Sequence, residues 1–308
     1  MDRIRFIDGH CDTAFELWSR GEQLAENTCH IDLGKASAFR AYAQVFAFCS
    51  YAGCSVGAPF TVEEMLTLPL KKLRQEVEHN ADRIAFAATA EEVTTLNEKG
   101  KIAALLSVEG PEVIGCDPVR LALLRTEGFV MTTLTWNADN ALAGCHASSQ
   151  GLSRRGAEFV RTAEDLGILI DVSHLSERAF WDLARIARCP ILASHSNCRA
   201  LCEHTRNLTD DQLRAVAESG GTVGLNLYPP FLGENADFSV LQRHLEHMLR
   251  LCGEDHVAIG GDLDGCEELA DGFSDLSDFA GFYEFLRGQG YEEALLDCIF
   301  YTNLLHLF

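Results

Sequence analysis

The sequence predicts an α/β protein of the (β/α)8-barrel (TIM-barrel) class, and three observations support this prediction. Short apolar runs alternate with longer amphipathic segments along the whole chain. The runs are apolar throughout, which is typical of parallel strands that are covered on both faces. The length of 308 residues suits one such barrel. A doubly wound sheet is the competing fold, but no glycine-rich phosphate loop follows the first apolar run.

The apolar runs predict eight strands, at residues 3–10, 42–50, 102–110, 129–137, 167–174, 190–196, 221–229 and 256–265. Amphipathic periodicity predicts helices between them, at residues 61–80, 153–166, 176–187, 209–219 and 239–252. Ser176 and Thr209 each precede acidic residues, so we expect both to be helix N-caps. No linker interrupts the pattern, and we expect one catalytic domain over residues 1–308.

Composition limits the classes of partner and the compartment. The net charge of −21 disfavours nucleic acids and anionic membranes as partners, because like charges repel. The sequence shows neither a signal-peptide pattern nor an apolar run of membrane-spanning length, so we expect a cytoplasmic protein. The 12 cysteines form no CxxC pairs, which predicts free thiols. Cys49 and Cys189 lie in apolar runs and are expected to be buried.

Polar residues lie at the ends of the predicted strands. In a barrel the carboxyl ends of all strands meet at one mouth, so these residues are expected to lie close together although they are far apart in sequence. They are His10, Asp12, Glu109, Asn137, His174, His195, Tyr228 and Asp262.

Five of these residues predict a metal site. His10 and Asp12 are two residues apart in a strand and therefore share a face. Glu109 ends an apolar strand, where a carboxylate is costly unless it is paired or metal-bound. His174 and His195 end strands in the same way. Each alone has a structural interpretation, as a hydrogen-bonded core residue. Together they exceed the needs of one tetrahedral ion and suit two ions about 3.5–4 Å apart that share a carboxylate and a water.

Other residues near the predicted mouth have two interpretations. Asp262 is a candidate for moving a proton to or from the attacking water, whereas Asp264 is expected to cap local N–H groups. Arg206 can bind a substrate carboxylate or form a salt bridge with Glu203 or Asp210. The role of His146 stays open. We interpret the remaining histidines as surface or structural residues: His30, His79, His204, His244, His247, His256 and His306.

With these motifs in place, the chain resembles the membrane dipeptidase (renal dipeptidase) family of barrel metallopeptidases, in its soluble bacterial-type form. The resemblance runs nearly end to end. The segment FIDGHCDT at residues 6–13 resembles the opening signature of the family, and LLSVEG at 105–110 resembles its strand with a bridging glutamate. The most specific match is the run 151–216, in which DVSH, SHSN and RNLTD follow in order. The segment IGGDLDG at 259–265 completes it.

The resemblance implies a distorted barrel of the metallo-dependent hydrolase type with two Zn²⁺ ions per chain, although other divalent ions could serve. One ion would be held by His10, Asp12 and Glu109, and the other by Glu109, His174 and His195. Arg206 would bind the C-terminal carboxylate of a dipeptide, Tyr228 would line the substrate pocket, and Asp262 would be the acid/base. The resemblance also implies a homodimer and tolerance of a D-residue at the C-terminal position of the substrate.

One departure concerns Trp136, which stands where mammalian members of the family carry a histidine that stabilises the developing oxyanion. Asn137 or His146 could take over that role. We therefore expect a zinc-dependent dipeptidase that cleaves dipeptides through a hydroxide bridging the two ions. The alternatives are a related barrel amidohydrolase acting on N-acyl amino acids, lactams or cyclic amides, and a non-catalytic metal-binding barrel.

Overall fold

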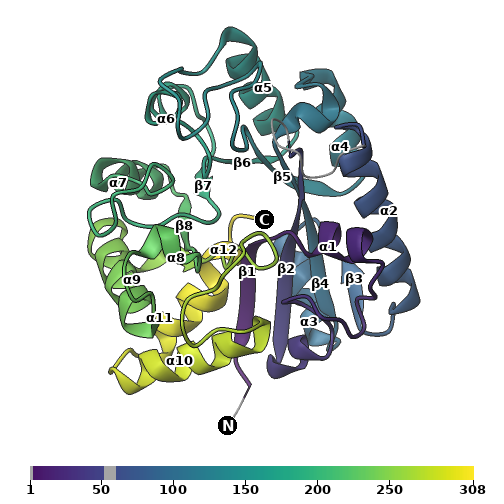
Figure 1. The fold of residues 1–308 in the computed structure, drawn as a ribbon, viewed down its shortest axis with the longest axis vertical. Helices are drawn as coiled ribbons and strands as arrows, with labels where there is room; N and C mark the ends of the chain where they lie inside the picture. Colours follow the sequence, from purple (N-terminus) through teal and green to yellow (C-terminus); the bar gives the residue numbers. More distant parts are fainter. Residues whose placement is uncertain (1–2, 52–59) are drawn as a thin grey trace.

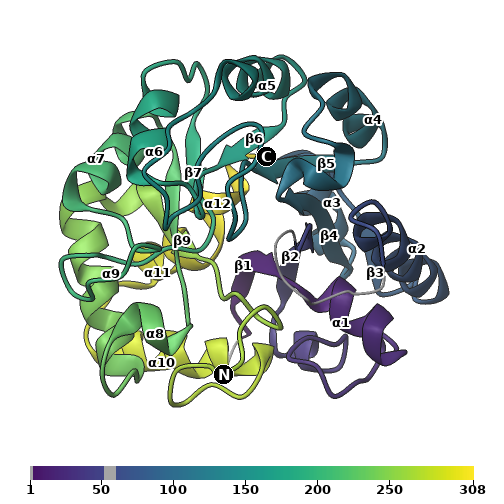
Figure 2. The same cartoon turned by 45° about the horizontal axis from the view of Figure 1, so that its top comes forward.

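The eight predicted strands are confirmed, and they form a parallel barrel. The structure is a computed structural model that describes residues 3–51 and 60–308. The barrel strands surround a central axis, with helices outside them (Figures 1 and 2). They pair in parallel in the following order: β1 (Arg5–Cys11), β2 (Ala41–Cys49), β4 (Ile102–Glu109), β5 (Phe129–Thr133), β6 (Leu169–Asp171), β7 (Ile191–Ala193), β8 (Thr222–Leu225) and β9 (Val257–Ile259).

The barrel is nearly closed. No continuous ladder joins β9 to β1 in the described chain; instead Cys11 and Leu263 form one isolated parallel bridge. The amide of Asp12 donates to the carbonyl of Leu263 at 3.0 Å. This contact lies at the carboxyl end of β1 and therefore fixes the backbone next to the predicted metal ligands. A further strand, β3 (Ile84–Phe86), pairs only with β4 and lies off the barrel path.

The five predicted helices are also present. They are α2 (Glu64–His79), α5 (Arg154–Asp165), α6 (Glu177–Ala184), α7 (Asp210–Glu218) and α9 (Phe238–Cys252). Both N-cap predictions are confirmed, because the side chain of Ser176 accepts from the amide of Ala179 and that of Thr209 accepts from the amide of Gln212.

Further elements were not predicted, most of them too short to show helical periodicity. The additional helices are α1 (Thr13–Arg20), α3 (Ala90–Glu98), α4 (Leu121–Thr126), α8 (Pro229–Leu232), α10 (Phe279–Gly288), α11 (Glu293–Asp297) and α12 (Asn303–Leu305). The 3-10 segments are η1 (Lys35–Ala38), η2 (Pro111–Ile114), η3 (Pro118–Arg120), η4 (Glu254–His256) and η5 (Leu276–Asp278), and η6 (Cys298–Thr302) is π-helical.

The barrel strands of the first half of the chain are longer than most of those in the second half. Strands β1, β2 and β4 have 7, 9 and 8 residues, whereas β6, β7 and β9 have 3 each. The sequence predicted longer strands in the second half. They end early at β6 and β7 because the amides of Ser173 and Ser194 donate to the carboxylate of Asp171, at 3.1 and 2.8 Å, instead of continuing a ladder. The residues that follow these strands are thus free to turn into the mouth.

Glycines let the strands approach one another under the mouth. A Cβ added at Gly224 would lie 2.0 Å from the carbonyl oxygen of Ser194, and one at Gly260 would lie 1.7 Å from it. No other residue fits at either position without moving the backbone. Because Ser194 precedes His195, this close packing sets the position of a predicted metal ligand.

The cysteine predictions have mixed outcomes. The cysteines of the described residues are free, as expected, and Cys49 is buried. The expectation for Cys189 was wrong: it is exposed, because it lies in the turn between α6 and β7 and not in the strand itself. Within residues 3–51 and 60–308, no helix combines the length and apolar character that crossing a bilayer requires.

Candidate metal centre

The centre begins at the end of β1. His10 lies in the strand and Asp12 directly follows it. Both are buried, and His10 Nε2 lies 3.4 Å from Asp12 Oδ2. The other oxygen, Asp12 Oδ1, is buried without a hydrogen-bond partner among the described residues. Such an atom is costly to bury unless something compensates it, as a cation would.

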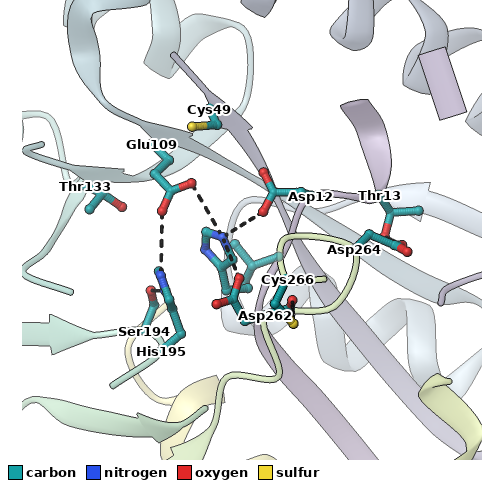
Figure 3. A network of polar contacts seen from close by, with 12 residues as sticks. Asp12, Thr13, Cys49, Glu109, Thr133, Ser194, His195, Asp262, Asp264 and Cys266 are labelled. Atoms are coloured by element: carbon teal, nitrogen blue, oxygen red, sulfur yellow. Dashed lines mark hydrogen bonds and ion pairs between the residues drawn. The ribbon is translucent and has the colours of Figure 1, made fainter. Parts of the chain in front are cut away.

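Glu109 lies between two groups of histidines. It is the last residue of β4 and is only 2% exposed. Its Oε2 is 3.6 Å from His10 Nε2, whereas its Oε1 is 2.9 Å from His174 Nε2 and 3.6 Å from His195 Nε2. Figure 3 shows the carboxylate reaching down toward His195, with Asp12 to its right and Asp262 below. Burial raises the pKa of Glu109 to about 8, although the charge of His10 opposes the shift.

His174 and His195 point their Nε2 atoms toward each other at 3.1 Å. Their Nδ1 atoms are held from behind: that of His174 lies 3.0 Å from Asn137 Oδ1, and that of His195 lies 2.7 Å from Ser194 Oγ. Because Asn137 Oδ1 can only accept, His174 Nδ1 carries the proton and Nε2 presents a lone pair. Burial lowers the pKa of both imidazoles, and the charges of Arg206 and His10 lower it further. Both effects favour neutral rings.

The buried carboxylate of Asp171 holds His195 in place indirectly, through the hydroxyl of Ser194. The hydroxyl of Ser194 donates to Asp171 Oδ2 at 2.8 Å and so accepts from His195 Nδ1. Asp171 also accepts from Thr133 Oγ1 at 2.6 Å and from Ser173 Oγ at 2.7 Å. A carboxylate behind a ligating imidazole is a common way to fix the ring and its tautomer.

Arg206 is buried beside the histidines. Its Nη2 donates to His174 Nε2 at 3.0 Å and lies 3.4 Å from the carbonyl oxygen of His195. Its guanidinium carbon is 5.3 Å from the ring centroid of Phe231. The salt-bridge alternative is not seen: within the described chain no ion pair joins Arg206 to Glu203 or Asp210, and Asp210 pairs with His247 at 2.7 Å.

His146, whose role the sequence left open, lies next to Arg206. Its Nδ1 is 2.7 Å from Thr205 Oγ1, and its ring centroid is 6.3 Å from that of His174. Burial and the charge of Arg206 lower the pKa of His146 to about 4. We call His146, His174, His195 and Arg206 the basic side of the centre.

The opposite side carries carboxylates, and we call His10, Asp12 and Asp262 the acidic side. Asp262 Oδ1 lies 3.9 Å from His10 Nε2. Asn226 Nδ2 donates to Asp262 Oδ2 at 3.0 Å and so fixes the carboxylate. Burial would lower the pKa of His10, but the nearby Glu109 and Asp12 raise it to about 10.

Two further aspartates near the acidic side have structural contacts. Asp264 accepts from Thr13 Oγ1 and from the amide of His30, both at 2.6 Å, and therefore ties the loop after β9 to α1. Asp8 lies before the mouth and accepts from the amide of Gly261 at 2.7 Å. Neither carboxylate is directed at the histidines of the centre by these bonds.

The donor set fits divalent ions. Among the described residues, two groups of three donors have their atoms within 4.8 Å of one another: His10, Glu109 and His195, and His10, Asp12 and Asp262. His174 joins the first group through Glu109 Oε1 and His195 Nε2. Imidazole and carboxylate are ligands of Zn²⁺ and similar ions, and the unpartnered Asp12 Oδ1 leaves ligand capacity unused.

The remaining predicted residues lie around this set. Tyr228 is half-buried, and its ring packs edge-on against Phe231 at 5.0 Å, so it lies near Arg206. Asn137 lies four residues beyond the end of β5 and contacts His174, so it supports a predicted ligand from behind. The ring of Trp136 packs edge-on against Tyr51 at 5.3 Å.

Sequence reasoning missed four residues of the centre. Asn226, Asp171 and Ser194 lie at or just after the ends of β8, β6 and β7. The rule that polar residues at strand ends converge could have found them. Thr205 carried no signal, because it lies in a loop whose position only the fold reveals.

Comparison with known proteins agrees with this geometry. The family model "Membrane dipeptidase (Peptidase family M19)" matches residues 1–308. An uncharacterized protein in the pqqA 5' region of Klebsiella pneumoniae is 32% identical over 258 residues, covering 79% of this chain and 95% of its own. Dipeptidase verJ of Clonostachys rogersoniana is 29% identical over 299 residues, covering 90% of this chain and 76% of its own.

A solved structure has the same architecture. It is a metallo peptidase from Rhodobacter sphaeroides liganded with a phosphinate mimic of the dipeptide L-Ala-D-Ala. The two chains superpose with a TM-score of 0.90 at 28% identity, and the match covers 99% of each.

Proposed function

Because the chain belongs to the membrane dipeptidase family and is thus a metallo-dipeptidase, we propose that it hydrolyses dipeptides with the help of two zinc ions. The observation that carries this proposal is Glu109, whose two oxygens face different histidines. This is the arrangement that a carboxylate shared by two ions requires. The residues 1–308 would form one catalytic domain.

Five residues would hold the ions: His10, Asp12 and Glu109 one of them, and Glu109, His174 and His195 the other. The neutral rings of His174 and His195 support this assignment, because each would present an Nε2 lone pair to an ion. Ligation by His174 requires Arg206 Nη2 to leave that nitrogen, which it contacts at 3.0 Å. When bound, the ions would supply Lewis acidity that polarises the scissile carbonyl and lowers the pKa of the attacking water.

Arg206 would hold the substrate by its C-terminal carboxylate. Its Nη1 is buried and has no hydrogen-bond partner in the described part of the chain. A buried guanidinium that already contacts the histidines through Nη2 offers this second nitrogen to an anion. Tyr228, close to Phe231 and Arg206, would line the same part of the pocket.

Asp262 would move the proton. Its Oδ2 accepts from Asn226, so Oδ1 is the oxygen that faces the centre near His10. Its carboxylate would take a proton from the attacking water and deliver it to the leaving amine, so that one water and one peptide bond give two amino acids. Asn226 keeps the carboxylate oriented through both transfers.

A D-residue at the C-terminal position would be accepted. The solved relative from Rhodobacter sphaeroides binds a mimic of L-Ala-D-Ala. In this chain the groups proposed to contact the substrate act on its carboxylate and its scissile carbonyl, and these groups are present in either configuration. Whether the D-residue is preferred depends on how the pocket surrounds the side chain.

Release of free amino acids tests the proposal. The purified protein would be assayed on L-L and L-D dipeptides and on an N-acyl amino acid, as prepared, after chelation and after zinc is restored. We expect dipeptide cleavage that is lost on chelation and regained with zinc, at about two zinc ions per chain. Cleavage of the N-acyl substrate alone would assign the chain to the amidohydrolase alternative. Two bound ions without any cleavage would favour the non-catalytic barrel.

A further inference from the structure

His146 is a polar residue of the mouth to which the proposed mechanism gives no role. It lies in the long segment between β5 and α5, and its side chain is half-buried. Among the described residues its side chain has one hydrogen bond, between Nδ1 and Thr205 Oγ1, and Nε2 is available. The ring also faces that of His204 at an interplanar angle of 25°, with centroids 6.3 Å apart. His146 is therefore held in one orientation by the loop that carries Arg206.

Arg206 and His146 lie on the same side of the centre. Thr205, the anchor of His146, is the residue immediately before Arg206 in the sequence. The cationic group that acts on His146 is Arg206, whereas the charged groups that surround His10 are the carboxylates of Glu109, Asp12 and Asp262. An anionic group of a substrate is thus favoured at the basic side, beside His146, and disfavoured at the acidic side.

Arg206 offers a buried donor to an anion. Its Nη1 has no hydrogen-bond partner in the described part of the chain, whereas its Nη2 contacts His174 and the carbonyl of His195. A carboxylate has two oxygens and accepts more hydrogen bonds than one nitrogen donates. A second donor close to Arg206 would therefore complete the recognition of the carboxylate.

We propose that His146 is this second donor, so that His146 Nε2 and Arg206 Nη1 together bind the C-terminal carboxylate of the dipeptide. The inference rests on the proposed dipeptidase function and adds to it a residue that selects substrates with a free carboxylate. In this proposal the hydroxyl of Thr205 donates to His146 Nδ1, so that the ring proton is on Nε2. Thr205 is then a positioning residue that acts through His146.

The test compares a dipeptide with its C-terminal amide, which lacks the carboxylate. For His146→Ala we expect kcat/KM for the dipeptide to fall about 10- to 100-fold, mainly through KM, which is the range for a hydrogen bond to a charged group. The value for the amide should stay within about 2-fold of wild type, because a clamp on the carboxylate has nothing to bind there. His79→Ala, an exposed histidine at the end of α2, is the matched control.

A second pair of variants tests the tautomer. Thr205→Ser keeps the hydroxyl and should retain the preference for the free acid, whereas Thr205→Val removes the hydroxyl and should lose part of it. Zinc content should be the same as in wild type in all four variants. Equal losses on dipeptide and amide, or no loss on either, would overturn the carboxylate clamp while leaving the dipeptidase function standing. Failure of the wild-type chain to cleave either substrate would overturn both.

Discussion

His10 and His174 both contact Glu109, yet their surroundings shift their pKa values in opposite directions. On the acidic side, burial would lower the pKa of His10, but the carboxylates of Glu109 and Asp12 raise it to about 10. On the basic side, burial and the charge of Arg206 both lower the pKa of His174. Burial is common to the two imidazoles, so the neighbouring charges decide the difference. One site thereby holds an anion-favouring half and a cation-favouring half a few ångströms apart.

Replacing Glu109, the residue shared by both sides, should have the largest effect on activity. For Glu109→Gln we expect kcat/KM to fall by more than about 10³-fold, beyond the usual loss for one positioned electrostatic group, because both proposed ion sites lose a charged ligand. Zinc content per chain should fall as well, measured by atomic emission. Glu98→Gln, an exposed change at the end of α3, is the control. Full activity with two ions retained would contradict the bridging role.

Changing Asp262 alone on the acidic side should leave metal binding intact. For Asp262→Asn we expect kcat to fall about 10²- to 10⁴-fold, the range for loss of a general acid/base, with KM and zinc content nearly unchanged. Steady-state kinetics and metal analysis check this together. Asp271→Asn, an exposed change in the same loop, serves as the comparison. Loss of an ion in the Asp262 variant would instead make this residue a ligand.

A histidine outside the centre shows the effect of burial on the pKa separately from the effect of nearby carboxylates. His244 in α9 is buried, accepts from the amide of Cys198 through Nδ1 and lies 3.2 Å from the carbonyl of Leu232 through Nε2. Burial lowers its pKa to about 4.

Between the ordinary histidine pKa of about 6.5 and pH 4 the unfolded chain binds the proton more readily. The free energy of unfolding should therefore fall as pH falls through this window, by about 3 kcal/mol from this residue. Chemical denaturation of wild type and His244→Gln across this range checks the prediction, with His79→Gln as reference. The His244 variant should show a shallower dependence on pH, and equal slopes would exclude this contribution.

The smallest expected effect comes from weakening one support of the basic side. For Asn137→Ala, His174 Nδ1 loses its acceptor, and we expect zinc affinity to fall about 10- to 100-fold, as for other residues behind metal ligands. Competition with a chromogenic chelator measures it. Asn137→Asp keeps an acceptor oxygen and should retain most of the affinity. An equal loss in both variants would show that the Asn137 side chain acts by packing and not as an acceptor.

The sequence determined much of this molecule. Runs of apolar residues predicted the eight barrel strands, because a strand buried on both faces has little choice of side chain. Polar residues at the ends of those runs identified His10, Asp12, Glu109, His174 and His195. Such residues are conspicuous, since an ionisable group at the end of an apolar strand needs a physical reason. The two N-caps could be predicted as well, because each depends only on residues nearby in the sequence.

Only the tertiary structure decided how these groups divide into two sides. No sequence pattern indicated that Arg206 would contact His174, or that His146 would contact Thr205, because each pair comes from loops whose conformations depend on packing. The early ends of β6 and β7 have the same origin: Asp171 captures the amides of Ser173 and Ser194 only once the strands are side by side. Electrostatic neighbours are set by distance in space, and periodicity along the chain carries no record of that distance.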